Sequence, residues 1–252
     1  EFDNLLKTKL ESVIYCSDYN SLNKLARNHS HIKNKMSYHA QIISNTSSSS
    51  KFEVHYQDTS YVFETNLLGA HNIANLTACL LWFFQEGFSY ADLQKAVQTL
   101  KLGKRRQEER GHFQEALFID DFAHHPRAVE TTIQGIKNKY PDKKIVAVFE
   151  PISATARSSM FQSEFTQALA NAHEVVLCQP SLLTTVKNAN NIDLAKMQAD
   201  LISQKKPCSV FTTLQDLLSY FQETANSEKV YLVMSNRTCL GLWESDFIKT
   251  LQ

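Results

Sequence analysis

The stretch EALFIDDFAHHPRAVETTIQGIKNKY, residues 115–140, decides the fold. Its first part, residues 115–123, is apolar except for Glu115 at its start and two carboxylates near its end, which predicts a buried strand that exits into a polar turn. Residues 126–140 predict a helix, and Pro126 suits its first turn, where a backbone N–H is not needed. A strand that runs directly into a helix is the start of a β-α-β unit.

The same alternation continues to the end of the chain, which predicts an α/β fold with a mostly parallel sheet and flanking helices. Further strands are expected at residues 143–151, 174–180, 208–212 and 229–236, and further helices at 160–172, 192–204, 214–225 and 242–252. Sites in such sheets lie at the carboxyl ends of the strands. The polar exits DDFAHHP, FEPISAT, CQPS and VMSN are therefore expected to line one crevice.

The first hundred residues have a different organisation. They predict a strand at 12–16, a helix at 19–28, a hairpin from 51–56 and 60–65, and helices at 69–87 and 89–100. The following run KLGKRRQEERG is charged and aperiodic, which is typical of a linker. We therefore expect one domain over 1–103, a hinge linker over 104–111 and a second domain over 112–252.

Composition excludes some classes of protein. Lys plus Arg and Asp plus Glu both number 26, so the chain lacks the net positive charge of a nucleic-acid-binding protein. No apolar run approaches the roughly 20 residues of a membrane span. The five cysteines are scattered, which predicts reduced thiols and a cytoplasmic location. Nothing in the sequence indicates an oligomeric state.

The strand exit DDFAHHP is the strongest candidate for chemistry. Asp120 and Asp121 should point to opposite faces of the strand, and Asp121 is nearer the exit. His124 and His125 precede a helix, whose positive end favours neutral imidazoles. The residues alone leave three interpretations open: a capping turn, a nucleotide or substrate site, and a metal site. No third convergent ligand is visible for a metal, so no metal ligand is assigned.

Two other groups invite a functional interpretation. Arg105 and Arg106 are either part of a solvated hinge or a phosphate grip. Asn72 and Asn75 lie three apart near a helix start, where they either cap the helix or contact a base. The chain contains six glycines and neither GxxxxGK[ST] nor GxGxxG, so it has no complete phosphate-binding loop.

Several stretches together resemble the Mur ligases, the ATP-dependent amide-forming enzymes of peptidoglycan metabolism. GAHNIANLTA resembles the G-x-H-N-x-x-N segment that ends the central ATPase domain of this family. GKRRQEERG is similar to the family's interdomain linker, and DDFAHHP to the D-D-[YF]-[GA]-H-H-P opening of the C-terminal domain. FEPISATARSSMFQ and VMSNRTCLGL most resemble the branch that acts in murein recycling, the murein peptide ligases.

The resemblance implies a reaction and a set of partners. UDP-N-acetylmuramate would be activated as an acyl phosphate by ATP with Mg²⁺ and joined to L-Ala-γ-D-Glu-meso-diaminopimelate, with domain closure excluding water. It also implies roles for particular residues. Asp121 and Arg106 would be catalytic, and the nucleotide would be bound by Asn72, Asn75, Arg106, Asp121 and His124. The substrates would be bound by His125, Ser153, Thr155, Arg157, Ser235 and Asn236.

Some positions depart from this pattern. Ile152 stands where the recycling branch has Arg, a role that Arg157 could take over, and Arg237 and Cys239 replace a Gly and a Phe. The family's UDP-sugar domain, phosphate-binding loop and magnesium-binding carbamylated lysine would lie upstream of Glu1. The chain alone is therefore expected to be inactive. Two alternatives remain: the family's UDP-N-acetylmuramate–L-alanine ligases, and a module that binds nucleotide or peptide without catalysis.

Overall fold

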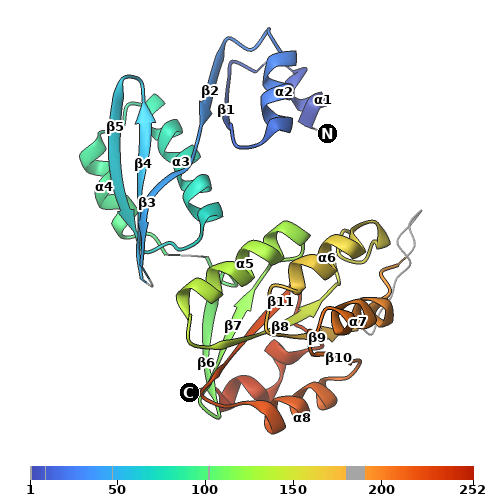
Figure 1. Ribbon diagram of the computed structural model, residues 1–252. Coiled ribbons are helices and arrows are strands. Elements are labelled where there is room, and N and C mark those ends of the chain that lie inside the picture. Colours follow the sequence, from blue (N-terminus) through green and yellow to red (C-terminus); the bar gives the residue numbers. More distant parts are fainter. Residues whose placement is uncertain (1, 9, 47, 102, 180–190) are drawn as a thin grey trace. The chain divides into compact units, whose positions relative to one another are not determined.

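The computed structural model divides the chain into two compact units, residues 1–101 and 102–252. It describes residues 2–8, 10–46, 48–101, 103–179 and 191–252. Figure 1 shows both units, and each is described here by itself. The expected helices and strands of the sequence analysis fall within one or the other.

The first unit packs helices against two small sheets. Its elements are α1 (Phe2–Leu6), β1 (Ser12–Cys16), α2 (Asn20–Asn28), β2 (Asn34–Tyr38), β3 (Gln41–Asn45), β4 (Ser50–Tyr56), β5 (Thr59–Thr65), α3 (Ala70–Gln85) and α4 (Tyr90–Gln98). β1 and β2 are parallel, whereas β3, β4 and β5 form an antiparallel meander. The predicted hairpin is thus confirmed, and its inward-facing side chains Phe52 and Phe63 stack with ring centroids 5.7 Å apart in the core.

The second unit contains a sheet of order β10-β9-β8-β11-β7-β6. Its elements are β6 (Glu108–Phe113), β7 (Ala116–Asp121), α5 (Pro126–Lys139), β8 (Lys144–Glu150), α6 (Gln162–Leu169), β9 (Glu174–Cys178), α7 (Leu194–Ser203), β10 (Cys208–Phe211), α8 (Leu214–Thr224) and β11 (Lys229–Ser235). All neighbouring pairs are parallel except β6 with β7. The predicted mostly parallel α/β sheet is confirmed.

Both faces of this sheet are covered, and alternating side chains of each strand enter different cores. Leu117 and Ile119 of β7 belong to the core beneath α5, α6 and α7 (Figure 1). Phe118 points the other way, into the core beneath α8 and the C-terminal 3₁₀ turns. This two-sided burial explains why the strands are apolar throughout, as is usual for strands of parallel sheets.

Two local expectations differ from the structure, and two short strands were not expected. Residues 108–111, assigned above to a linker, form the start of β6, a half-exposed edge strand in which charged residues are tolerated. β2 and β3 are short and largely solvent-exposed, so they carry little apolar alternation. The expected helix at 242–252 is two 3₁₀ turns, Leu242–Glu244 and Asp246–Thr250, separated by extended Ser245, whose hydroxyl accepts from the Phe247 N–H.

Candidate functional site at the carboxyl edge of the sheet

The ends of three adjacent parallel strands bring the predicted polar exits together. β11 lies between β7 and β8, and in the register of these strands Met234 pairs with both Asp121 and Phe149. Ser235 pairs with Glu150, the last residue of β8. The exits DDFAHHP, FEPISAT and VMSN therefore share one edge of the sheet, as expected from the sequence. The last two residues of the fourth expected exit, CQPS, lie outside the described residues.

Asp121 is buried, and its carboxylate holds both the segment before β6 and the turn that follows β7. Its Oδ2 accepts the Gln107 N–H at 2.9 Å and its Oδ1 accepts the Ala123 N–H at 2.8 Å. The side-chain hydroxyl of Thr132 lies 3.5 Å from Oδ1. Burial raises the pKa of the Asp121 carboxyl, although these two N–H groups act to lower it. In this arrangement Asp121 shapes the site rather than presenting a bare carboxylate to it.

Asp120 faces the other side of the sheet, as the alternation of the strand predicts. It is fully buried and forms an ion pair with Arg105, whose Nε lies 3.0 Å from Oδ2. The same guanidinium donates to the Ser235 carbonyl at 2.6 Å and to the Arg237 carbonyl. Arg105 therefore connects the segment before β6 to the exits of β7 and β11.

The segment before β6 is folded onto this edge. The Arg105 carbonyl accepts the Phe122 N–H at 2.9 Å, and the Arg105 N–H donates to Glu108 at 2.7 Å. Arg105 and Gln107 both have left-handed backbone, with φ of 59° and 51°, which these hydrogen bonds hold in place. Much of the predicted linker is thus a fixed part of the second unit.

Arg106 is the exposed member of this arginine pair. The guanidinium carbons of Arg105 and Arg106 lie 5.4 Å and 5.7 Å from the Phe122 ring centroid, within cation–π range. Phe122 therefore orients both side chains, and Arg106 keeps its charge at the surface. An exposed guanidinium on a rigid aromatic support is suited to an anionic group.

The two histidines have different environments. His124 is half-buried, and its Nδ1 lies 2.8 Å from the Phe122 carbonyl. A carbonyl can only accept, so Nδ1 carries the proton and Nε2 of the neutral ring is left as an acceptor. His125 is the exposed N-cap residue of α5, and its ring lies 5.6 Å from that of Phe161. The pair therefore presents one fixed and one exposed imidazole at this helix end.

Glu150 organises the exit of β11, a role that the sequence analysis did not assign. Its buried carboxylate accepts the Ser235 hydroxyl at 2.6 Å and the N–H groups of Cys239 at 3.1 Å and Leu240 at 2.8 Å. The sequence signal was present, because a carboxylate that ends a fully buried strand must find donors. Ser235 is fully buried by this contact, so we now give it a positioning role in place of substrate contact.

The loop after β8 carries three more of the predicted substrate residues. The Ser153 hydroxyl accepts the Ala156 N–H at 3.0 Å, and the Ser153 and Thr155 carbonyls accept from the backbone of residues 157 and 158. Arg157 in turn accepts the Ile192 N–H at 2.7 Å on its carbonyl. Asn236 follows Ser235 and is half-buried. These side chains lie on tightly turned backbone at the same edge of the sheet.

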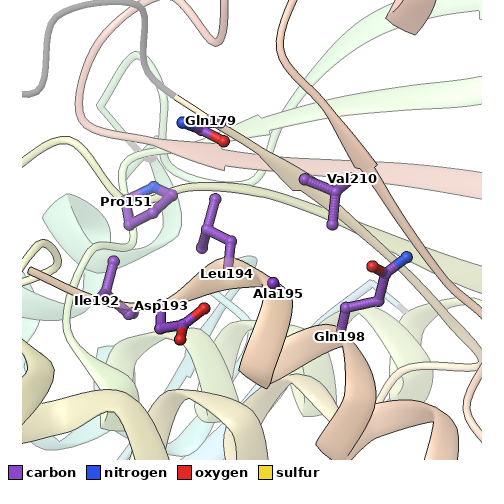
Figure 2. Close-up of a pocket in the computed structure, with 8 residues that line it drawn as sticks. All are labelled: Pro151, Gln179, Ile192, Asp193, Leu194, Ala195, Gln198 and Val210. Atoms are coloured by element: carbon purple, nitrogen blue, oxygen red, sulfur yellow. The ribbon is translucent and has the colours of Figure 1, made fainter.

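A cavity of about 410 Å³ lies further along this edge, where β8, β9 and β10 meet the start of α7. Figure 2 shows Leu194 and Pro151 beside it, with the amides of Gln179 and Gln198 at different sides. None of the predicted site residues lines it. Pro151 and Gln179 belong to two of the strand exits that were expected at this edge, whereas the lining residues from β10 and α7 carry no motif that could have indicated a cavity.

In the first unit, Asn72 and Asn75 lie at the start of α3, as predicted. The Asn72 amide donates to the Leu68 carbonyl at 2.7 Å, so it ties the helix to the preceding segment but caps none of the free N–H groups of α3, and Asn75 is exposed. Gly69 before the helix has φ of 93°, and a Cβ there would lie 3.0 Å from the His71 ring. Glycine is therefore required at the first position of this GAHN segment.

No group of three or more His, Cys, Asp or Glu side chains among the described residues is arranged to hold a metal ion. No helix of the described parts is long and apolar enough to cross a membrane.

Comparison with known proteins identifies the family. Residues 105–237 match the family model described as Mur ligase, glutamate ligase domain. A UDP-N-acetylmuramate–L-alanine ligase of Lactobacillus gasseri is 32% identical over 199 residues, which is 73% of this chain and 45% of the relative. One from Francisella philomiragia is 26% identical over 242 residues, 91% of this chain and 52% of the relative. The chain thus spans about half the length of these relatives.

Solved structures share the fold. A murein peptide ligase of Psychrobacter arcticus superimposes with a TM-score of 0.72 at 21% identity, covering 96% of this chain and 52% of that one. A UDP-N-acetylmuramate–alanine ligase of Thermotoga maritima gives 0.69 at 17% identity, covering 98% and 62%. The family match covers more than half of the chain and includes the whole carboxyl-edge site from Arg105 to Arg237, so the chain belongs to the Mur ligase family.

Proposed function

We propose that this chain is part of an ATP-dependent ligase that joins the carboxylate of UDP-N-acetylmuramate to the amine of an L-alanyl residue. The exposed Arg106, held on Phe122 beside the exit of β7, is the observation that carries the proposal. Activation of a carboxylate by ATP creates negative charge on the transferring phosphate, and a fixed guanidinium stabilises such charge. The family and its cytoplasmic substrates also favour a cytoplasmic enzyme.

In the second unit, Arg106 and His124 form the nucleotide side of the proposed site. In the first unit, taken by itself, Asn72 and Asn75 are proposed as contacts to the base. His124 offers Nε2 as an acceptor because Nδ1 donates to the Phe122 carbonyl. Asp121 fixes both ends of this turn and thereby positions Arg106 and His124. ATP supplies the activating phosphoryl group. Mg²⁺ would be held mainly by protein residues outside this chain.

The acceptor side of the proposed site is formed by His125, Ser153, Thr155, Arg157 and Asn236. Here the chain contributes binding and orientation, which convert the attack of an amine into a near-unimolecular step. Arg157 takes the place of the arginine that the motif has at Ile152. Ser235 acts indirectly, because its hydroxyl is occupied by Glu150.

Two acceptors fit this chemistry. The FEP segment favours L-Ala-γ-D-Glu-meso-diaminopimelate, the peptide used in murein recycling, and this is our first choice. Free L-alanine is the second, because the relatives reported above are L-alanine ligases. Both acceptors present an L-alanyl amine, so they differ in what lies beyond the reacting group.

The proposal is tested in the longest natural reading frame that contains this chain. Amide formation is measured with ATP, UDP-N-acetylmuramate and either L-alanine or the tripeptide in excess. We expect product with one acceptor at a kcat/KM at least about 100-fold above the other. Product with neither, despite ATP binding by the protein, would make the chain a binding module.

A matched pair of variants tests the role of the site. Arg106→Ala should lower the rate of amide formation by about 100-fold, and Lys104→Ala, which removes a neighbouring exposed charge, should leave it nearly unchanged. Equal effects of the two substitutions would refute a specific role for Arg106.

A further inference from the structure

Two cysteines from distant parts of the chain meet beneath the carboxyl edge. Cys178 is the last residue of β9, and Cys239 lies in the segment that follows β11. Their Sγ atoms are 3.7 Å apart, and both side chains are fully buried. β8 separates β9 from β11 in the sheet, so the two thiols meet across the end of β8.

The segment that carries Cys239 is held in an unfavourable backbone conformation. Cys239 and Leu240 have φ of 54° and 53°, in the left-handed region that non-glycine residues rarely adopt. Their two N–H groups donate to the Glu150 carboxylate, which also accepts the Ser235 hydroxyl. The strain of this segment is therefore balanced by one buried carboxylate.

We propose that Cys178 and Cys239 form a redox site, in which a peroxide converts the two thiols to a disulfide when the segment Asn236–Gly241 opens. The two thiols are distinct from the nucleotide and acceptor contacts proposed above and do not depend on them, although the segment that opens begins at Asn236, one of the acceptor contacts. It joins the ends of β9 and β11 covalently, which fixes the segment that follows Ser235 and Asn236.

The chemistry balances with hydrogen peroxide as the oxidant. One thiol attacks the peroxide, the O–O bond breaks, and a sulfenic acid and one water form. The second thiol then attacks the sulfenic sulfur, the S–S bond forms, and a second water leaves. The two sulfurs lose two electrons in all, and peroxide gains them.

Burial controls the rate of this reaction. The neighbouring Cys178 and burial raise the pKa of the Cys239 thiol, and a protonated, buried thiol reacts slowly. The closed state is therefore protected, and local opening of the segment held by Glu150 limits oxidation. Weakening that hold should accelerate the reaction.

The first experiment treats the native chain with hydrogen peroxide, alkylates the remaining thiols and digests the product with trypsin. Cleavage after Arg157 and Arg237 places Cys178 and Cys239 in separate peptides, each with a single cysteine. We expect these two peptides to be joined, with a mass lower by two hydrogen atoms than their sum. Oxidation of Cys79, which is exposed, is the control that shows that the oxidant has acted.

Matched variants decide the assignment. Cys178→Ser and Cys239→Ser should each abolish the joined peptides, whereas Cys208→Ser, which changes a half-buried cysteine of the adjacent β10, should leave their yield unchanged. Persistence of alkylatable Cys178 and Cys239 after Cys79 is oxidised would overturn the proposal. So would joined peptides that involve mainly Cys208, Cys79 or Cys16.

Two further variants test the control by Glu150. Ser235→Ala removes one hydrogen bond to the carboxylate and should raise the rate of disulfide formation about fivefold. Glu150→Gln should raise it further, and Ser235→Ala remains informative if Glu150→Gln fails to fold. A rate that is unchanged in a folded Ser235→Ala chain would refute opening of this segment as the controlling step.

Discussion

Arg105 and Asp120 form an ion pair between the segment before β6 and the buried end of β7, with the Arg105 Nε 3.0 Å from the Asp120 Oδ2. The carboxylate is fully buried, whereas the Arg105 side chain is 27% exposed. Of the residues that follow each of them, Arg106 is at the surface, whereas Asp121 is buried and hydrogen-bonded. The two arginines therefore have different expected effects when changed.

Arg105→Met should destabilise the second unit, because buried Asp120 would keep only the weaker ion pair with Arg110, whose Nη1 lies 4.0 Å from the Asp120 Oδ2. Loss of one partner of a buried pair costs about 3–5 kcal/mol, and the partial exposure of Arg105 reduces this to about 2 kcal/mol. Urea denaturation measures the change in the free energy of unfolding. Arg106→Met is the matched control and should change that free energy by no more than about 0.5 kcal/mol. Equal destabilisation by the two substitutions would contradict the different roles that we assign to Arg105 and Arg106.

Asp121→Asn should lower stability as well as activity. The motif alone suggested a polar exit residue whose substitution affects mainly the rate, but Asp121 is buried and accepts two backbone N–H bonds. An amide group would turn a donor toward one of these N–H groups, at a cost of about 1–3 kcal/mol. The melting temperature of Asp121→Asn should be lower than that of the native chain. Asp142→Asn, which changes an exposed aspartate, is the control and should leave the melting temperature unchanged. An unchanged melting temperature would indicate that the Asp121 hydrogen bonds contribute little.

Acidification should destabilise the second unit through His173. Its Nδ1 accepts the Ile145 N–H at 2.9 Å, which requires a neutral ring. His173 is exposed at the surface, so the shift is modest: partial desolvation of its ring, and then the charges of Lys137, Lys206 and Lys144, lower its pKa below the ordinary 6.5. A base with a lowered pKa in the folded state contributes stability that is present above the unfolded pKa and is lost as pH falls below it.

The test of this pH dependence is a series of melting temperatures between about pH 7.5 and 5.5. As the pH falls, the melting temperature of the native chain should decrease by more than that of His173→Asn. In this variant an amide oxygen, which does not titrate, replaces the accepting nitrogen. His55→Asn, in the β4–β5 hairpin, is the control and should follow the native chain. Parallel curves for the native chain and His173→Asn would contradict the assignment.

Limited trypsin digestion should cut the chain first after Lys101 or Lys104. Each unit has its own hydrophobic core, and the boundary between them lies at residues 101–102. Arg105 is engaged with Asp120, and Arg110 lies in β6, where it stacks over Trp243 at 5.1 Å. Peptide masses from a short time course identify the first cut. Early cleavage after Arg110 would place the hinge later than we propose.

The chain by itself should not turn over ATP, because its sequence has no phosphate-binding loop to surround the phosphates with backbone N–H groups. Phosphate release is measured with ATP, Mg²⁺, UDP-N-acetylmuramate and the tripeptide. A rate near or above about 1 s⁻¹, typical of enzymes, would contradict this expectation. The same assay on the longest reading frame is the positive control.

The β-α-β pattern of the second unit could be read from the sequence because its strands are buried on both faces. Continuous apolar runs such as residues 145–149 have no other stable environment in a protein of this size. β6 was hidden because an edge strand can carry Glu108, Glu109 and Arg110 without loss. The C-terminal turns were hidden because Ser245 interrupts a sequence that otherwise has helical composition.

The site was predictable in position but not in function. The exits of β7, β8 and β11 could be placed on one edge because parallel strands end together. Which carboxylates are exposed could not be inferred, since Asp120, Asp121 and Glu150 find their donors in residues 15, 14 and 90 positions away along the chain. The pairing of Cys178 with Cys239, 61 positions apart, was invisible for the same reason.

The position of β11 in the sheet has a consequence for synthesis of the protein. β11 is the last strand to be made, yet it lies between β7 and β8 and pairs with both. Until residues 229–235 have left the ribosome, β7 and β8 have no neighbour on that side, and their apolar edges are open to other chains. The second unit should therefore fold late and slowly, and depend on chaperones more than a protein whose strands pair in order of synthesis.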